Sequence, residues 1–252
     1  MYFDSHAHYD DKRFNNDRKS LLDNLPKQGV DYVVNIGADM RSSKASVELA
    51  ENYGYIYATV GVHPHYVKNM KDGDLRTLET YAAHKKVVAI GEAGLDFYRD
   101  LSPRELQRLW FKKQIELALK LDLPFIVHSR DASEETMEII KASGLNRGVI
   151  HCYSGSTQMA YDYVKMGFYI GIDGPVTYDN AKKINDVVYS VPMDRLLIET
   201  DAPYLTPNPN RGKRNDSTQL QYIVNAIAQI KQMTPESVAE ATSFNAKKLF
   251  GI

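Results

Sequence analysis

Cysteine is almost absent from this sequence, because Cys152 is the only one among 252 residues. A single cysteine cannot form a disulfide within the chain, which excludes a small disulfide-stabilised fold. No stretch approaches the roughly 18 apolar residues that a membrane-spanning helix needs. The segment MYFDSHAHYDDKRF also lacks the basic and apolar regions of a secretory signal. We therefore expect a cytoplasmic protein that does not bind membranes.

An excess of charge of either sign is missing as well. The chain has 31 Lys and Arg against 32 Asp and Glu, for a net charge of −1. A broad basic field that attracts nucleic acid over long distances is excluded, so any polyanion must be bound by local contacts. With 43% hydrophobic residues and no Pro- or Ser-rich linker, we expect residues 1–252 to form one globular domain. Nothing in the sequence indicates an obligate protein partner.

Short apolar runs alternate with longer amphipathic stretches, which is the pattern of βα units around a parallel sheet. Helical stretches such as Arg104 to Leu121 and Ala132 to Lys141 lie between the runs. The predicted strands are Tyr2 to His6, Tyr32 to Ile36, Ile56 to Gly61, Val87 to Gly91, Phe125 to His128, Gly148 to His151, Phe168 to Ile172 and Arg195 to Glu199. Eight such strands favour an α/β fold, a single (β/α)8 TIM-type barrel, over an open doubly wound sheet. The last stretches, Thr218 to Met233 and Pro235 to Phe250, should close and cap it.

Six of the seven histidines lie at or just beyond the carboxyl ends of predicted strands, where barrel active sites are built. A lone histidine is usually a packing or loop residue, but random placement would put histidines on helices too, and only His84 lies elsewhere. His6 and His8 share one face of an extended segment and can reach the same metal ion. Asp4 lies one step deeper on that face, where it could orient a ligand histidine.

Acidic residues follow two of the strands. Glu92 lies between small residues in Gly91-Glu92-Ala93-Gly94, so its carboxylate can approach a metal closely, and its two oxygens can bridge two cations. Asp96 competes for this role but lies farther beyond the predicted strand. After the eighth strand, Asp201 can bind metal beside the first histidine pair and accept a proton from water. For Glu199, one step lower, an orienting role and a buried structural ion pair both stay open.

His128 and His151 each follow an apolar run, a recurrence that packing does not explain. By alternation Cys152 should point away from the site as a buried thiol and not serve as a nucleophile.

One catalytic zinc usually takes three protein ligands and a water, which is fewer than the candidates available. The six candidate metal ligands are His6, His8, Glu92, His128, His151 and Asp201. Two divalent cations that activate a bridging water for hydrolysis fit this number of ligands better than a single zinc does. Zn²⁺ and Mn²⁺ suit mixed ligands and Mg²⁺ prefers oxygen, so Zn, Mn and Mg all stay open.

Taken together, these motifs resemble the TatD family of metal-dependent deoxyribonucleases, a branch of the amidohydrolase-like barrels, nearly from end to end. The resemblance rests on Phe3 to His8, Gly61-Val62-His63-Pro64-His65, Gly91 to Tyr98, His128 to Ala132, His151 to Gly155 and Glu199 to Leu205. It implies a (β/α)8 barrel with Glu92 bridging two metals. His6, His8 and Asp201 would hold one metal, and His128 and His151 the other. It also implies hydrolysis of DNA phosphodiesters, commonly from a 3′ end.

The resemblance is incomplete at two places. Family members often have Asn-Glu-Pro where this chain has Asn215-Asp216-Ser217, and often Phe where Tyr153 stands. Both places lie outside the expected ligand set. They therefore bear on substrate detail and not on the metal site.

Local contacts must supply phosphate recognition. Arg130 follows a ligand histidine by two residues, and Arg211 opens a basic loop, Arg211 to Arg214, that is equally well explained as a solvated turn. The resemblance suggests that His63 faces the substrate as a phosphate contact or proton donor, with a structural hydrogen bond as the alternative. Three tyrosines could stack bases: Tyr98, Tyr153 and Tyr204. We therefore predict DNA, as single strands or ends, as the substrate.

Two other functions stay open. An amidase or lactonase on the same barrel would use the same chemistry, because an activated water attacks a carbonyl carbon as readily as phosphorus. Many such enzymes bridge their metals with a carbamylated lysine where this chain has Glu92. A non-catalytic barrel that binds metal for stability is the more distant alternative.

Overall fold

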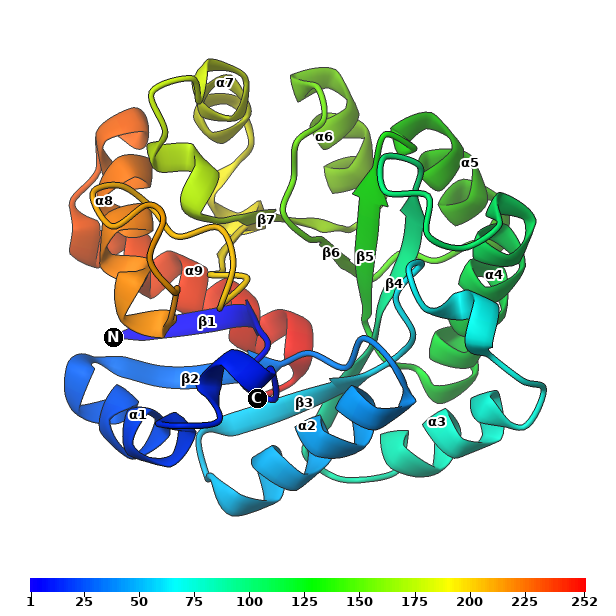
Figure 1. The fold of residues 1–252 in the computed structure, drawn as a ribbon. Helices are drawn as coiled ribbons and strands as arrows, with labels where there is room; N and C mark the ends of the chain where they lie inside the picture. The colour runs from blue at the N-terminus through cyan, green and yellow to red at the C-terminus, as the bar shows by residue number, and fades with distance from the viewer.

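The computed structural model describes residues 1–252 and confirms the (β/α)8 barrel. Eight parallel strands pair in the order β1 to β8, with helices around the outside (Figure 1). The strands are β1 (Tyr2–Ala7), β2 (Val30–Asn35), β3 (Ile56–Val60), β4 (Val87–Asp96), β5 (Phe125–Arg130), β6 (Gly148–Ile150), β7 (Tyr169–Ile172) and β8 (Leu196–Ile198). Their nearly continuous apolar runs suit strands that are covered on both faces.

The helices follow the strands as predicted, and α4 and α9 have the predicted bounds. The α-helices are α1 (Arg18–Asn24), α2 (Met40–Asn52), α3 (Asp74–Ala82), α4 (Arg104–Leu121), α5 (Ser133–Ser143), α6 (Thr157–Lys165), α7 (Lys182–Ser190), α8 (Leu220–Lys231) and α9 (Pro235–Phe250). Short 3₁₀ helices are η1 (Lys12–Phe14), η2 (Leu25–Gln28), η3 (Val67–Asn69), η4 (Gly174–Thr177), η5 (Met193–Arg195) and η6 (Ser217–Gln219). None of the helices combines the length and apolar character required to cross a membrane.

Helix α9 closes the end of the barrel at which the strands begin. It starts at Pro235 behind the Thr234 cap and ends before Gly251, which has a positive φ of 70°. Leu249 and Phe250 join the buried cluster inside the barrel, and the Phe250 ring lies 6.0 Å from that of Phe3. Because α9 covers this end, the opposite end is the one that polar loops can line.

The ring closes through residues that follow β8 and not through β8 itself. The amide of Asp201 donates to the carbonyl of His6 at 2.9 Å, and the amide of His8 donates to Ala202 at 2.7 Å. A parallel bridge also joins Ala7 to Ala202. Closure therefore brings the His-x-His segment beside Asp201.

Strand β4 is longer than the predicted Val87 to Gly91. Its pairing with β5 shifts register between Ile90 and Ala93, and then continues as far as Asp96. Gly91 permits the irregularity, since it has a φ of 122° and an added Cβ would lie 2.6 Å from the Ile126 carbonyl oxygen. Glu92 lies within the irregular segment.

Candidate active site

Two histidines, one glutamate and one aspartate form the first half of the site. His6 Nε2 lies 3.2 Å from His8 Nε2, and Asp201 Oδ1 lies 3.3 Å from His8 Nε2 and 3.7 Å from His6 Nε2. Glu92 Oε2 lies 3.5 Å and 4.0 Å from the same two nitrogens. Donors about 2.0–2.2 Å from one tetrahedral cation are roughly 3.3–3.6 Å apart, so this group fits one divalent cation.

The second half lies at the other oxygen of the same glutamate. Glu92 Oε1 is 2.8 Å from His128 Nδ1, 3.6 Å from His63 Nε2 and 3.8 Å from His151 Nε2. Burial raises the pKa of Glu92, but the surrounding histidines outweigh it and hold that pKa well below its usual value. The carboxylate is therefore ionised, and each of its oxygens faces a different group of imidazoles.

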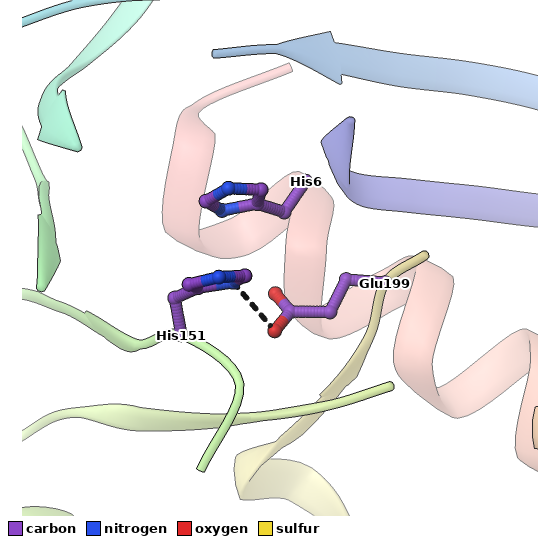
Figure 2. Close-up of side chains that lie close together, drawn as sticks. All are labelled: His6, His151 and Glu199. Atoms are coloured by element: carbon purple, nitrogen blue, oxygen red, sulfur yellow. Dashed lines mark hydrogen bonds and ion pairs between the residues drawn. The ribbon is translucent and has the colours of Figure 1, made fainter. Parts of the chain in front are cut away.

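Glu199 orients His151 from below the site. Its Oε1 accepts a hydrogen bond from His151 Nδ1 at 2.9 Å (Figure 2). The same oxygen accepts the Cys152 amide at 2.6 Å. The contact with His151 directs Nε2 of that ring toward Glu92, while the His6 and His151 rings stack with centroids 3.5 Å apart. Burial opposes charge on His151, but Glu199 and Glu92 raise its pKa to about 10. The orienting role left open from the sequence matches this geometry.

Asp96 does more than the sequence indicated, because β4 reaches it. Its Oδ2 accepts hydrogen bonds from His65 Nε2 at 2.7 Å and from His128 Nε2 at 3.3 Å. Its Oδ1 accepts the backbone amides of Tyr98 at 3.1 Å and Arg99 at 2.7 Å. Asp96 therefore joins two histidines to the loop after β4. The Gly94-Leu95-Asp96 segment is strand and not loop, because its pairing with β5 continues as far as Asp96.

Asp4 does not orient an imidazole. Its carboxylate accepts hydrogen bonds from the hydroxyls of Thr200 at 2.7 Å and Ser217 at 2.6 Å, and it reaches His6 only through the backbone amide at 3.3 Å. The register of β1 is irregular between Asp4 and Ala7, so simple alternation does not extend from Asp4 to His6. Burial raises the pKa of Asp4 to about 7.

The Asn215-Asp216-Ser217 segment fastens the loop after β8. The Asn215 amide group donates to the carbonyl oxygens of Thr200 at 2.8 Å and Tyr204 at 2.7 Å, while Ser217 reaches Asp4. Asn215 is fully buried. The segment that departs from the family pattern therefore holds the backbone around Asp201.

Cys152 is not activated as a nucleophile. Burial raises the pKa of its thiol well above the ordinary value, and the nearby carboxylate of Asp173 adds to this effect. A thiol that stays protonated is a poor nucleophile and a poor metal ligand.

The predicted substrate-binding residues Arg130 and Tyr153 differ in their exposure to solvent. The exposed Arg130 guanidinium lies 4.1 Å above the ring of Tyr98. Tyr153 is only 6% exposed, and its hydroxyl donates to the Ser156 carbonyl at 2.6 Å. Its ring packs within the hydrophobic core, which leaves no open face on which a base could stack.

The two ends of the basic loop differ. Arg211 is exposed and lies 4.2 Å above the Tyr178 ring. Arg214 forms an ion pair with Asp17 at 2.6 Å, which ties it to the start of α1. Only Arg211 of these two is free to contact a ligand.

Comparisons with known proteins identify a family for this architecture. A family model described as "TatD related DNase" matches residues 3–251. The chain is 43% identical over its full length to an uncharacterized metal-dependent hydrolase, YabD, of Bacillus subtilis strain 168, of which it covers 100%. It is 34% identical to a Rahnella protein named 3′-5′ ssDNA/RNA exonuclease TatD, over 95% of this chain and 94% of that one. The crystal structure of the TatD homologue YjjV from Escherichia coli K12 superposes with a TM-score of 0.94 at 32% identity, covering 100% of this chain and 98% of that chain.

Proposed function

Because the chain belongs to the TatD-related DNase family of metal-dependent hydrolases, we propose that it removes nucleotides from the 3′ end of single-stranded nucleic acid with two divalent cations. One observation carries this proposal. Glu92 Oε2 faces His6 and His8, whereas Oε1 faces His128 and His151. A carboxylate shared in this way suits two cations that lie side by side.

The donor set divides between the two proposed cations. His6, His8 and Asp201 would hold the first, His128 and His151 the second, and Glu92 both. When bound, two such cations supply positive charge at the reacting and leaving oxygens of a phosphodiester and lower the pKa of a water. The mixture of imidazole and carboxylate donors favours Zn²⁺ or Mn²⁺ over Mg²⁺.

Asp201 is placed to accept the proton of the attacking water. Burial raises the pKa of this carboxyl, but the hydrogen bond from His8 and the charges of the site histidines hold it below its usual value. Asp201 is therefore ionised and able to receive a proton. Its Oδ1 lies 3.3 Å from His8 Nε2 and 3.9 Å from His151 Nε2, between the two halves of the site.

Phosphate recognition falls to residues around the donor set. His63 is 7% exposed, and burial together with the neighbouring His128 holds its pKa well below the usual value. A neutral imidazole there can donate one hydrogen bond to a phosphate oxygen. Arg130 and Arg211 are the exposed guanidinium groups that we assign to the flanking phosphates.

The Rahnella relative supports the choice of nucleic acid over other esters, since its name states a 3′-5′ single-strand exonuclease and it is similar along nearly the whole chain. The proposal also agrees with the net charge of −1. With so little net charge, recognition of a strand end depends on a few local phosphate contacts.

The test is digestion of single strands labelled at the 3′ or the 5′ end, together with a circular single strand, with Zn²⁺, Mn²⁺ or Mg²⁺ supplied in turn. We expect mononucleotides from the linear strands, release of the 3′ label first, and no cutting of the circle. Glu92→Ala serves as the inactive control for contaminating nuclease.

Three outcomes would contradict the proposal in different ways. Cutting of the circle as fast as the linear strand would rule out end recognition. Release of the 5′ label first would reverse the polarity. Turnover of an amide or a lactone with no cutting of nucleic acid would show that the chain is an amidase or lactonase and not a nuclease.

A further inference from the structure

Two tyrosine–arginine stacks lie on opposite sides of the open end of the barrel. Tyr98, after β4, carries the Arg130 guanidinium from β5 at 4.1 Å. Tyr204, after β8, carries the Arg13 guanidinium from η1, which follows β1, at 3.9 Å. Because the strands form a ring in the order β1 to β8, the β4–β5 junction lies across from the β8–β1 junction. We call these pairs the β4–β5 stack and the β8–β1 stack.

The rings of both stacks are accessible. Tyr98 is 59% exposed and Tyr204 is 45% exposed, although each already has an arginine on its ring. Exposed tyrosines also occur elsewhere on this chain, and what distinguishes these two is their place beside the donor set. Two such rings at the mouth of a site provide platforms on which flat groups can stack.

Each stack is tied to one half of the donor set. The Tyr98 amide donates to Asp96, and the same carboxylate accepts a hydrogen bond from His128. The Tyr204 amide donates to the carbonyl of Asp201 at 2.8 Å, and its ring centroid lies 6.3 Å from that of His8. The donor set therefore lies between the stacks: the β8–β1 stack contacts it directly at Asp201, and the β4–β5 stack reaches it through Asp96.

The two stacks differ in charge. Arg13 forms two hydrogen bonds with Asp11, Nε to Oδ1 at 3.0 Å and Nη2 to Oδ2 at 3.2 Å, so its charge is matched by a carboxylate. Arg130 has no ion pair in the structure and is exposed. An unmatched guanidinium can accept a phosphate as its partner, whereas a paired one would first have to give up its carboxylate.

We propose that the stacks are two unequal subsites for a single strand that crosses the mouth. The β4–β5 stack binds one nucleotide by its base on Tyr98 and by its phosphate on Arg130. The β8–β1 stack binds a second nucleotide by its base alone, on Tyr204. The bond to be cut lies between these nucleotides, above Glu92. This inference rests on the proposed function and specifies how that function's substrate is held.

The experiment measures binding and cleavage of one single-stranded oligonucleotide by the metal-loaded protein across a range of salt. A phosphorothioate strand that resists hydrolysis reports affinity by fluorescence anisotropy. The subsite variants are Tyr98→Leu, Tyr98→Phe, Tyr204→Leu, Tyr204→Phe, Arg130→Gln and Arg13→Gln. Two control variants lie away from the mouth. Arg195→Gln removes an arginine 5.4 Å above the Tyr169 ring at the start of β8, and Tyr189→Leu removes a tyrosine 70% exposed on α7.

We expect each leucine variant at the stacks to weaken affinity and raise KM by roughly 5- to 150-fold, the loss typical of one stacked base. The phenylalanine variants should stay close to the wild type, because the ring is kept. Arg130→Gln should make the log–log salt slope shallower by about 0.7, the contribution of one phosphate on a single strand. Arg13→Gln should leave that slope unchanged.

The outcomes separate this inference from the function on which it rests. If the wild type cuts the strand and the stack variants match Arg195→Gln and Tyr189→Leu in affinity, the subsites are wrong while the function stands. If Arg13→Gln and Arg130→Gln change the salt slope equally, the proposed inequality is wrong. If the wild type neither binds nor cuts the strand, the proposed function itself fails, and this inference with it.

Discussion

Replacing Gly171 with alanine adds one methyl group, which should displace the Glu199 carboxylate that orients His151. Gly171 lies in β7, and a Cβ there would lie 2.5 Å from Glu199 Oε1 and 2.7 Å from its Cδ. Ordinary contact begins at 3.4 Å, so the carboxylate would have to retreat by roughly 0.9 Å in a close-packed interior. The φ of Gly171 is not positive, so the alanine costs nothing in backbone conformation.

The retreat would cost Glu199 its hydrogen bonds to His151 and to the Cys152 amide. Losing the partner of a buried polar group costs about 1–3 kcal/mol, which is roughly 2–12 °C in Tm for a domain of this size. Loss of a residue that orients a metal ligand typically lowers metal affinity by about 10- to 100-fold. We therefore expect Gly171→Ala to bind metal more weakly and to melt earlier.

Competition with a chelator of known affinity measures the first effect, and thermal unfolding measures the second. Gly54→Ala is the matched control, because no atom lies within 4 Å of its added Cβ. Pairing Gly171→Ala with Glu199→Asp shortens the acid and should restore part of the lost metal affinity. If Gly171→Ala matched Gly54→Ala in both assays, the position of the Glu199 carboxylate would have no bearing on metal binding.

Three further substitutions test the site and its support. Glu92→Ala should lose metal and turnover together, because one side chain is assigned to both cations; a variant that kept two equivalents of metal by elemental analysis would exclude the bridge. Asp201→Asn should keep the fold but lose rate by about 100-fold or more, since an amide cannot accept the proton, and near wild-type turnover would remove Asp201 from the mechanism. Asn215→Ala should lower the free energy of unfolding by about 1–3 kcal/mol, because the buried carbonyl oxygen of Thr200 and the carbonyl oxygen of Tyr204 lose their donor. Chemical denaturation measures this loss, and an unchanged midpoint would show that the loop is held in another way.

The local sequence pattern alone determined the barrel and showed where along the chain most of the candidate metal ligands lie. Apolar runs that alternate with amphipathic stretches specify strand and helix through side-chain periodicity, which is why α4 and α9 have the predicted bounds. The carboxyl ends of parallel strands meet at one end of a barrel, so histidines that follow separate strands can be assigned to a common site before the structure is known.

Only the tertiary structure decided how those donors face one another. The register shift in β4 depends on its pairing with β5, and this pairing places Glu92 at the centre and brings Asp96 within reach of His128. The room for Glu199 comes from Gly171, on a neighbouring strand. The surroundings of the two stacked arginines also differ. Arg13 pairs with Asp11, only two residues away in sequence, whereas Arg130 reaches Tyr98 from another strand and has no carboxylate partner. Contacts of this kind join residues distant in sequence, and periodicity carries no information about them.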